Sequence, residues 1–501
     1  MSRGRKAADR RDIGLMALLD LIEAKVPRPQ VRHYTRGSQY EEVHREGITE
    51  ITIPVRNAPS DHRAHLEYAI RKEALDLLAW KAIVDAFGPT IFREWILSQP
   101  TGKHARRAWC LYELLTGEHL DVPESVVSNS VPLADSSLQL TSSRSTILPR
   151  YKVAYNLLGP PEFCPLIRNS KDLGPERLAY LGRQVAQAVQ GIDPRDLQRA
   201  TDYLYHKETK ASFQIEREDV SAIRRERFVQ ALRGAEADRW FDEGELVRLQ
   251  HQIVEPRYRE HGFREKQVYV GQTMPWGEER VHYACPRPDD VKQLMAGWRE
   301  CLNRTVGINP ICQAAVLGFG FVFIHPFEDG NGRLHRFIIH ATLARRRFTP
   351  PNTVIPISAL MLRRKDQYDA ALEVFSKSIM PFVEFQLDTE GEMTVSNETA
   401  SLYRYWDATA QCQYLCDAIE ETIAVDLPEE LRTLRAFDAG IAAIAEIVDM
   451  PDRRVSLLMR LLIQNGYRLS KSKRAQFPEI TDLELGSIEQ AVRAAVEGPL
   501  A

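Results

Sequence analysis

The chain has 501 residues, more than one hydrophobic core usually supports, which predicts roughly two to four domains. Hydrophobic residues make up 44% and charged residues 27%, a composition that excludes a disordered or fibrous protein. Sixty-six Lys and Arg against 69 Asp and Glu leave a net charge of -3, which excludes a polycation that coats nucleic acid.

The seven cysteines are scattered and form no CxxC pair, so neither a zinc site nor a redox motif is predicted, and reduced thiols are expected. The basic start is followed by an apolar run that charged residues interrupt and that offers no small-residue cleavage site. No run of about 18 uncharged apolar residues occurs, so we expect no membrane span. These features predict a cytoplasmic protein.

The N-terminal third is expected to form a helical region over residues 1–170. Residues 65–98 carry apolar positions at helical spacing, after a short strand-like segment at 48–55. Residues 122–150 are rich in Ser, Thr and Pro and predict a loop or linker, and residues 156–170 are a second linker-like run.

Helical spacing returns with few interruptions over residues 171–390, which we expect to form one domain. Within it, residues 266–290 are rich in β-branched and aromatic side chains around Pro275 and Gly277. That composition predicts a β-hairpin.

A turn between two helices carries the clearest chemical signal. An apolar helix-like run ends at His325, a turn rich in Asp and Gly follows, and a second helix begins near Asn331. Gly330 and Gly332 lack a Cβ, so a phosphate can approach the unpaired N–H groups at the positive end of this helix. The second helix has one apolar face, which leaves its other face to look into a cleft; the apolar residues are Leu334, Phe337, Ile338 and Ala341.

The charged residues around this helix start also fit a bound phosphate. Arg333 and Arg336 lie in the first turn, where the dipole disfavours cations unless an anion compensates them. Asp329 offers the hard oxygen that Mg²⁺ accepts beside phosphate oxygens and waters. His325 is a base that titrates near neutral pH.

Residues 325–336, HPFEDGNGRLHR, match the Fic family pattern HxFx(D/E)GNGRxxR at every specified position. The chain therefore resembles the Fic/Doc superfamily, and the resemblance implies a mainly α fold: a helical Fic core with a short β-hairpin flap. It also implies a protein adenylyltransferase, which moves AMP from ATP onto a Ser, Thr or Tyr hydroxyl of a target protein. His325 would take the proton of that hydroxyl, and Phe327 would anchor the loop.

The resemblance further implies that Asp329 holds Mg²⁺, that Arg333 grips the β-phosphate and that Arg336 grips the γ-phosphate. Doc relatives transfer a phosphoryl group and carry Lys where this chain has Gly332, so Gly332 favours AMP transfer, with a Doc-like phosphotransferase as the alternative. The residues implied to bind phosphates are Gly330, Asn331, Gly332, Arg333 and Arg336.

A second pattern lies upstream, in residues 209–218 (TKASFQIERE). Ser212 and Glu216 resemble the inhibitory motif (S/T)xxxE(G/N), whose position before the core is that of the Fic class with an N-terminal inhibitory helix. By this resemblance, Glu216 would pair with Arg336 and withdraw it from the γ-phosphate. Arg217 stands where the family has Gly or Asn, and one exposed charge on a solvated helix is the alternative interpretation of Glu216.

Three weaker patterns concern the rest of the site. Tyr368 resembles a tyrosine near the family's adenine pocket, although a Tyr at helical spacing also fits a core position. The hairpin at 268–283 is either the flap that pins a target segment by main-chain pairing or a structural hairpin. His335 and His340 lack partners at metal spacing and are interpreted as packing residues.

Residues 391–501 are expected to form a C-terminal helical module that resembles a winged helix, with a turn at Asn465 and Gly466 before several basic residues. A nucleotide-sensing DNA-binding regulator is therefore the alternative to the enzyme. The partners that the resemblance implies are ATP and a target protein, for which the chain itself is one candidate. Some family members also remove AMP through the same loop.

Overall fold

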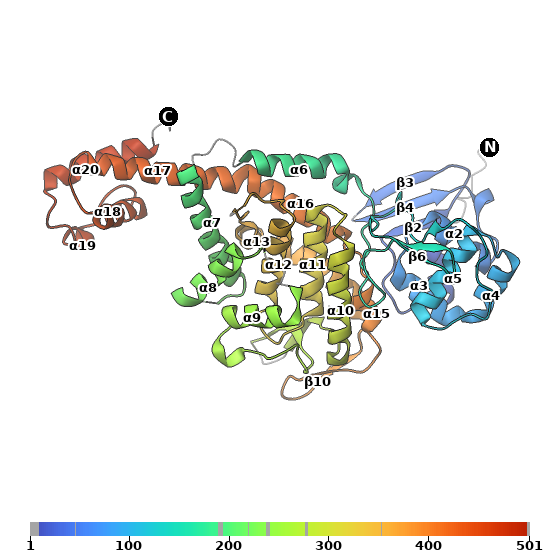
Figure 1. Ribbon diagram of the computed structural model, residues 1–501. Helices are drawn as coiled ribbons and strands as arrows, with labels where there is room; N and C mark the ends of the chain where they lie inside the picture. The colour runs from blue at the N-terminus through green and yellow to red at the C-terminus, as the bar shows by residue number, and fades with distance from the viewer. Residues whose placement is uncertain are drawn as a thin grey trace, which may run out of the picture.

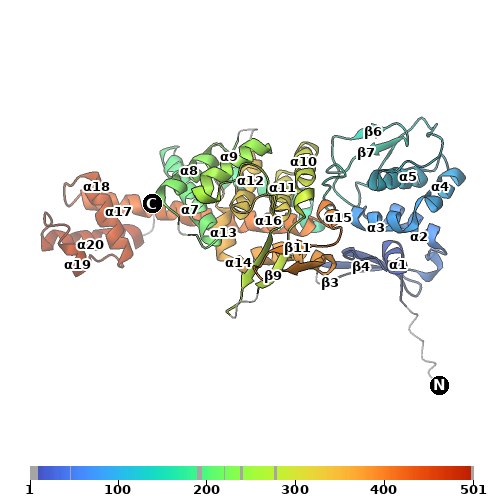
Figure 2. The same ribbon diagram turned by 90° about the horizontal axis from the view of Figure 1, so that it is seen from below.

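The computed structural model places the chain in three consecutive parts (Figure 1). An N-terminal α/β part and a C-terminal group of helices lie at opposite ends of a central helical part, and Figure 2 shows the same order from below. The structure describes residues 10–45, 47–188, 194–218, 220–236, 241–275, 279–351 and 353–497.

The N-terminal part begins with a four-stranded sheet in the order β1-β2-β4-β3, which lies beside the helices that the sequence predicts for this region. The central β2–β4 pair is parallel, and the outer pairs are antiparallel. Runs such as ITEITI supply the β-branched residues that favour strands, but the strands are too short to stand out from sequence alone. The strands are β1 (Arg11–Asp12), β2 (Val31–Thr35), β3 (Glu41–Arg45) and β4 (Ile48–Ile53).

Five helices complete this part, and three of them confirm the helical spacing over 65–98. Asp61 and Asp76 cap α2 and α3 by accepting backbone N–H bonds at 2.9 Å and 3.0 Å. Trp80, Trp95 and Trp109 fill the core between the helices. The helices are α1 (Leu15–Leu21), α2 (His62–Lys72), α3 (Leu77–Phe87), α4 (Pro89–Ser98) and α5 (Lys103–Thr116).

The two segments predicted as loops or linkers contain little regular structure, and both are packed against the rest of the chain. Residues 122–155 contain a small sheet in the order β5-β7-β6. In the second segment, Phe163 lies against two glycines of the central part: a Cβ on Gly320 would lie 2.6 Å from its ring, and a Cβ on Gly297 would lie 2.7 Å from its backbone nitrogen. Tertiary packing therefore overrides the loop-like composition. The strands are β5 (Val131–Pro132), β6 (Thr146–Leu148) and β7 (Val153–Tyr155).

The central part contains two buried helices that are joined by the start of the segment 325–336, called the 325–336 loop. α11 (Pro310–Ile324) is apolar on all sides, and α12 (Asn331–Arg345) packs along it. The sequence predicts that one face of α12 looks into a cleft, but α7, α8 and α9 cover that face. Around them lie α6 (Pro175–Ala188), α7 (Pro194–Ile215), α8 (Ala222–Arg233), α9 (Glu243–Ile253), α10 (Pro288–Arg304), α13 (Ile357–Arg363) and α14 (Lys365–Ile379).

The predicted hairpin is confirmed: β8 (Tyr269–Thr273) pairs antiparallel with β9 (Glu279–Ala284) and projects from the central part (Figure 2). Pro275 lies in its turn, and Gly277 lies outside the described residues.

The central core continues beyond residue 390. α16 (Thr409–Glu421) packs against α11 and α14, following β10 (Phe385–Leu387), β11 (Met393–Val395) and α15 (Ala400–Arg404). The boundaries expected at 170 and 390 stay predictions, and side chains on both sides of each pack into one core.

The C-terminal helices have a separate core around Leu458, Met459 and Ile488. After the turn at Gly466 the described residues up to 497 form two helices joined by turns, where a winged helix would have strands. Arg474, at the end of the first of these helices, donates to the carbonyl of Phe477 at 2.6 Å and stabilises the turn that follows. The helices are α17 (Leu427–Ala445), α18 (Asp452–Gln464), α19 (Lys471–Arg474) and α20 (Asp482–Glu497).

All seven cysteines are buried and free. Among the described residues, every helix is either too short or too polar to cross a bilayer.

Candidate active site

His325 lies at the end of α11, where the chain turns out of the helix with a positive φ of 52°. Its Nδ1 lies 3.1 Å from the carbonyl oxygen of Val322. Because a carbonyl oxygen can only accept a hydrogen bond, Nδ1 is assigned the proton of the neutral ring. Nε2 then carries the lone pair that can accept a second proton. Burial lowers the pKa of His325 to about 4. The ring is therefore neutral at pH 7 and able to accept a proton.

Arg264 fixes this end of the loop, and no sequence motif marks it. It is 3% exposed, and its Nε donates to the carbonyl of His325 at 2.7 Å. Its backbone N–H donates to Pro326 O at 2.8 Å, and its Nη2 donates to Pro286 O at 2.6 Å. One buried guanidinium thus ties the loop to the segment that follows the flap.

Asn331 closes the loop from the other end. Its Oδ1 accepts the N–H of Phe327 at 3.0 Å, and its Nδ2 donates to the carbonyl of Phe327 at 2.7 Å. Phe327 is fully buried, as expected for an anchor, between the rings of Phe263 and Phe321. The Asn331 side chain therefore shapes the loop in this state, and a phosphate contact from it stays a prediction.

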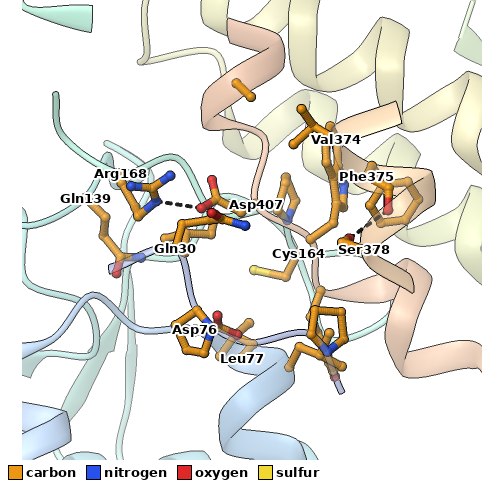
Figure 3. Close-up of a pocket in the computed structure, with 18 of the residues that line it drawn as sticks. Gln30, Asp76, Leu77, Gln139, Cys164, Arg168, Val374, Phe375, Ser378 and Asp407 are labelled. Carbon is orange, nitrogen blue, oxygen red and sulfur yellow. Dashed lines mark hydrogen bonds and ion pairs between the residues drawn. The ribbon is translucent and has the colours of Figure 1, made fainter. Parts of the chain in front are cut away.

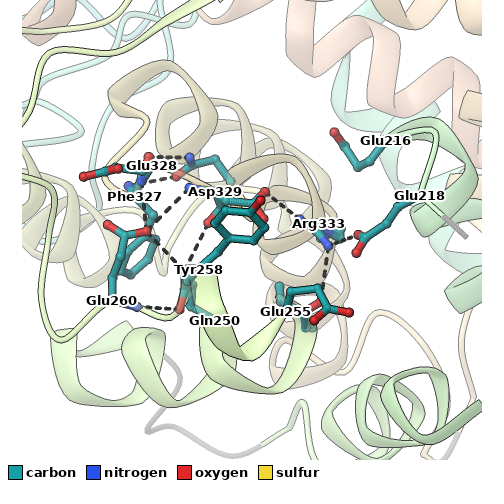
Figure 4. A network of polar contacts seen from close by, with 12 residues as sticks. Glu216, Glu218, Gln250, Glu255, Tyr258, Glu260, Phe327, Glu328, Asp329 and Arg333 are labelled. Atoms are coloured by element: carbon teal, nitrogen blue, oxygen red, sulfur yellow. Dashed lines mark hydrogen bonds and ion pairs between the residues drawn. The ribbon is translucent and has the colours of Figure 1, made fainter. Parts of the chain in front are cut away.

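Glu260 supports the middle of the loop and is also absent from the residues that the sequence singles out (Figure 4). Its Oε1 accepts the backbone N–H groups of Glu328 at 2.9 Å and Asp329 at 3.5 Å, and the Nε2 of Gln250 at 3.1 Å. Burial raises the pKa of Glu260 to about 6. Such long-range contacts carry no local sequence signature, so only the fold reveals them.

Asp329 presents a single carboxylate beside the loop. Its Oδ1 accepts Nη2 of Arg333 at 2.7 Å, and its side chain is 44% exposed. The described residues contain no group of three or more His, Cys, Asp or Glu side chains that could hold a metal. One exposed carboxylate fits Mg²⁺ that takes its other ligands from nucleotide phosphates and water.

The start of α12 has no room for a side chain at either of its two glycines. Gly330 has a φ of 95°, and a Cβ there would lie 2.9 Å from Val254. A Cβ on Gly332 would lie 2.2 Å from Oε1 of Glu216. A carboxylate of the 209–218 segment thus occupies the place at the helix N-terminus where a phosphate is expected.

Arg336 is enclosed by the 209–218 segment. Its Nε donates to Ser212 Oγ at 2.8 Å, and its Nη2 donates to Ser212 O at 2.7 Å and to Glu216 Oε1 at 2.8 Å. Partial burial opposes the ionisation of Glu216, but Arg336 and Arg333 hold its pKa below the usual value. The predicted pair of Glu216 and Arg336 is present in the structure.

The chain turns sharply after α7. Arg217 has a φ of 57°, the left-handed conformation that Gly and Asn adopt at the end of a helix. Glu218 follows, and its backbone N–H donates to Phe213 O at 3.2 Å. The turn accounts for the family's Gly or Asn at the position of Arg217.

Arg333 is the second arginine of the loop and is 3% exposed. Its Nη1 contacts Glu218 Oε2 and the carbonyl of Ile253, the latter at 3.2 Å (Figure 4). Together with its bond to Asp329, these contacts engage both terminal nitrogens of Arg333.

Residues 240–343 match the Fic/DOC family. This range contains α9, the flap and the whole of the 325–336 loop. The chain therefore contains a Fic domain. The 325–336 loop is accordingly its Fic loop.

Two curated relatives show the extent of the likeness. The protein adenylyltransferase Fic of Drosophila grimshawi is 33% identical over 193 residues, which cover 36% of this chain and 35% of that protein. That of Drosophila mojavensis is 33% identical over 129 residues, 25% of this chain and 22% of that protein. The chain thus spans about a third or less of the length of the curated relatives it matches.

Solved structures of Fic proteins are more distant. A Fic family protein from Desulfovibrio desulfuricans G20 is 20% identical with a TM-score of 0.37, over 58% of this chain and 87% of that chain. Fic-1 (residues 134–508) from C. elegans is 18% identical with a TM-score of 0.32, over 50% and 71%.

The helix α7 is also anchored one turn before Ser212. Glu208, 1% exposed, lies 2.7 Å from Nε2 of His340 and accepts the N–H of Ser358 at 2.8 Å. His340 is expected to be a packing residue, and it has this buried carboxylate as a long-range partner. α7 is therefore tied to α12 and α13 by polar contacts along its length.

Tyr368 lies in the core beside the Fic loop. It is 4% exposed on α14, and its ring stacks on His335 with the ring centroids 6.0 Å apart. Burial raises the pKa of Tyr368 to about 12. His335 packs between Tyr368 and Phe319, as expected for a packing residue. A role for Tyr368 toward adenine stays a prediction.

The flap is anchored at its base and open at its tip. Tyr283 is buried, and its hydroxyl donates to the carbonyl of Phe323 just before His325. A register irregularity between Val270 and Gly271 bends the hairpin. In the described residues the two strands pair only with each other, which leaves free strand edges near the Fic loop.

A cavity of about 200 Å³ lies between the N-terminal part and the central part (Figure 3). Asp76 and Gln139 line it on one side and Phe375 and Ser378 on the other. Its lining includes no residue of the Fic loop, so it is separate from the candidate active site.

Proposed function

We propose that the protein is an adenylyltransferase that moves AMP from ATP onto a hydroxyl side chain of a target protein. The observation that carries the proposal is the juxtaposition of a neutral His325 with an anion-binding helix start and two buried arginines. The names of the Drosophila relatives support the same chemistry.

In the proposed reaction, Nε2 of His325 takes the proton of the target hydroxyl. The hydroxyl oxygen forms a bond to the α-phosphorus, the bond from that phosphorus to the bridging oxygen breaks, and pyrophosphate leaves. The backbone N–H groups of Gly330 to Gly332 and the charges of Arg333 and Arg336 stabilise the phosphates. Asp329 would hold Mg²⁺, which neutralises negative charge on the phosphate oxygens when bound.

The target segment is proposed to pair with the flap. The free strand edges near the Fic loop offer main-chain donors and acceptors to an extended peptide. Main-chain pairing brings a hydroxyl side chain to His325 without selecting a particular target sequence. We include self-modification and the removal of AMP in the proposal, because both would use the same groups. We also propose a cytoplasmic location, which the free cysteines support.

We further propose that the 209–218 segment is a brake. The Glu216 carboxylate occupies the anion site over Gly332 and binds Nη2 of Arg336, so it competes with the γ-phosphate. A nucleotide can bind productively only when Glu216 leaves.

ATP labelled at the α-phosphorus tests the proposal. Labelled protein is expected in a Glu216→Gly variant, less in the wild type, and none when His325→Ala is added. Label from the γ-phosphorus instead would identify a Doc-like phosphotransferase, and salt-dependent DNA retention without transfer would favour the regulator.

A further inference from the structure

Glu218 links two arginines from different helices. Its Oε2 binds Nη1 of Arg333 on α12 (Figure 4), and its Oε1 accepts Nη2 of Arg224 on α8 at 2.5 Å. The side chain of Glu218 is 26% exposed, whereas those of Arg333 and Arg224 are 4% and 9% exposed. A carboxylate at the surface therefore closes over two largely buried cations.

Arg333 is held by acidic groups on both sides. Nη1 binds Glu218, and Nη2 binds Asp329 Oδ1 at 2.7 Å. Its buried Nε has no hydrogen-bond partner among the described residues. A buried donor without a partner costs free energy, so this guanidinium is not fully satisfied by its resting contacts.

The charges at rest are balanced by carboxylates alone. Arg333 and Arg336 face Glu218 and Glu216, which lie two residues apart on the same turn of chain. Nη1 of Arg333 has two N–H groups, which donate to Glu218 and to the carbonyl of Ile253. A phosphate that binds this nitrogen must therefore displace one of these acceptors, and Glu218, the anion of the two, competes for the same charge.

We propose that Glu218 is a second inhibitory carboxylate, which keeps Arg333 engaged while Glu216 keeps Arg336 engaged. The inference rests on the proposed function and concerns the regulation of the same site. It assigns separate tasks to the two carboxylates: Glu216 blocks the γ-phosphate position, and Glu218 withholds the arginine assigned to the β-phosphate. Asp329 is paired with Arg333 at rest, so the proposal also implies that Asp329 can bind Mg²⁺ only once Arg333 is released.

The turn at Arg217 couples the two contacts. Glu216 and Glu218 flank the left-handed residue Arg217, so a movement that unwinds this turn displaces both carboxylates. Release of the brake is therefore one event that frees both arginines, provided that the turn moves as a unit.

A purely structural role for Glu218 makes a different prediction. If Glu218 only ties α8 to α12, its removal lowers the melting temperature and leaves nucleotide affinity unchanged. If it competes with phosphate, its removal strengthens nucleotide binding even where stability falls. Nucleotide affinity is therefore the discriminating measurement.

The test compares Glu218→Gln and Glu216→Gln, alone and combined, with Glu255→Gln as the matched control. Glu255 contacts Arg224 at 3.5 Å, and Glu255→Gln removes the same charge without touching either phosphate arginine. Dissociation constants for Mg²⁺–ATP are measured by calorimetry in the His325→Ala background, which prevents turnover. Transfer is measured with His325 intact.

Glu218→Gln is expected to tighten Mg²⁺–ATP binding about tenfold or more, the scale of one lost charged hydrogen bond to a competitor. Glu255→Gln is expected to bind like the reference protein, and the double variant is expected to transfer AMP faster than Glu216→Gln alone. Unchanged affinity in Glu218→Gln, with only a lower melting temperature, overturns the inference.

The two proposals fail separately. If Glu216→Gln transfers label but Glu218→Gln does not tighten binding, the inference on Glu218 is wrong and the adenylyltransferase stands. If Glu218→Gln tightens binding but no variant transfers label, the competition at Arg333 is supported and the proposed activity is wrong.

Discussion

The carboxylate of Glu216 lies directly over Gly332, where a Cβ would come within 2.2 Å of its Oε1. Because Gly332 has no side chain, two different anionic groups can occupy the space over it. It admits a phosphate to the start of α12 in the proposed reaction, and it admits the carboxylate of the 209–218 segment at rest.

Gly332→Ala is predicted to change stability in opposite directions in two backgrounds. In the wild type the new Cβ displaces Glu216 and lowers the free energy of unfolding. In a Glu216→Gly background the same Ala gains about 0.5–1 kcal/mol, because Ala favours a helix over Gly. Denaturant unfolding of the four proteins measures the effect.

Gly182→Ala on α6 is the matched control, since its Cβ would meet only Phe348 at an ordinary 3.8 Å. It should act alike in both backgrounds. The same sign for Gly332→Ala in both would show that Glu216 does not occupy the site over Gly332 in solution.

Arg217→Asn is predicted to strengthen the brake. The left-handed conformation of Arg217 costs roughly 1–2 kcal/mol for an ordinary residue and much less for Asn. The variant should therefore melt at a higher temperature and transfer less AMP than the wild type.

Lys152→Asn is the control for the stability that Asn gains at any left-handed position. Lys152 has a φ of 52° and lies in a turn that is far from the Fic loop in sequence. It should raise stability without changing transfer. Equal or greater transfer in Arg217→Asn would contradict a brake held by this turn.

The pH dependence of transfer should reflect a depressed pKa at His325. Burial lowers that pKa to about 4, and the neutral ring is the form that accepts a proton. In Glu216→Gly, kcat/KM is therefore expected to stay level with respect to His325 from pH 8 to about pH 6 and to fall as pH approaches 4.

Glu260→Gln serves as the control, because the pKa of Glu260 is raised to about 6 by burial. A fall centred near pH 6.5 that persists in this variant would show that His325 is more solvated than the structure indicates.

Glu73 is predicted to make the N-terminal part less stable at higher pH. It is 5% exposed, accepts the N–H of Leu15 at 3.1 Å, and its pKa is raised by burial from 4.5 to about 8. Since the folded state favours the protonated acid, its contribution is full below pH 4.5 and is lost as pH rises toward 8.

Glu73→Gln should remove that decline, so the variant gains stability over the wild type at pH 8 and gains little at pH 4.5. Glu41→Gln, on the exposed part of β3, should keep the wild-type slope. Parallel slopes in all three proteins by thermal unfolding would place Glu73 in a more polar environment.

Local chemistry explains which features the sequence could predict. The order of His325, the two glycines and the arginines is a contiguous pattern, and the flap has a composition unlike its helical surroundings. The pairing of Glu216 with Arg336 is predicted from a resemblance, and the fold brings these residues together from two helices.

Other features could not be predicted from the sequence, because they depend on long-range packing. Arg264, Glu260 and Glu218 act on the loop through contacts made across 61 to 115 residues, which leave no local signature. The segment around Phe163 has a linker's composition, yet it is buried, since Gly297 leaves room for its backbone and Gly320 leaves room for the Phe163 ring. The N-terminal strands are too short for their alternation to outweigh the neighbouring helices.

The most direct test of the central claim is the intact mass of the Glu216→Gly protein after incubation with Mg²⁺–ATP, alone and with candidate target proteins. The account predicts that the protein or a target gains the mass of one AMP, and that the gain disappears when His325→Ala is added. An unchanged mass in every sample, or a gain of one phosphate, would contradict it.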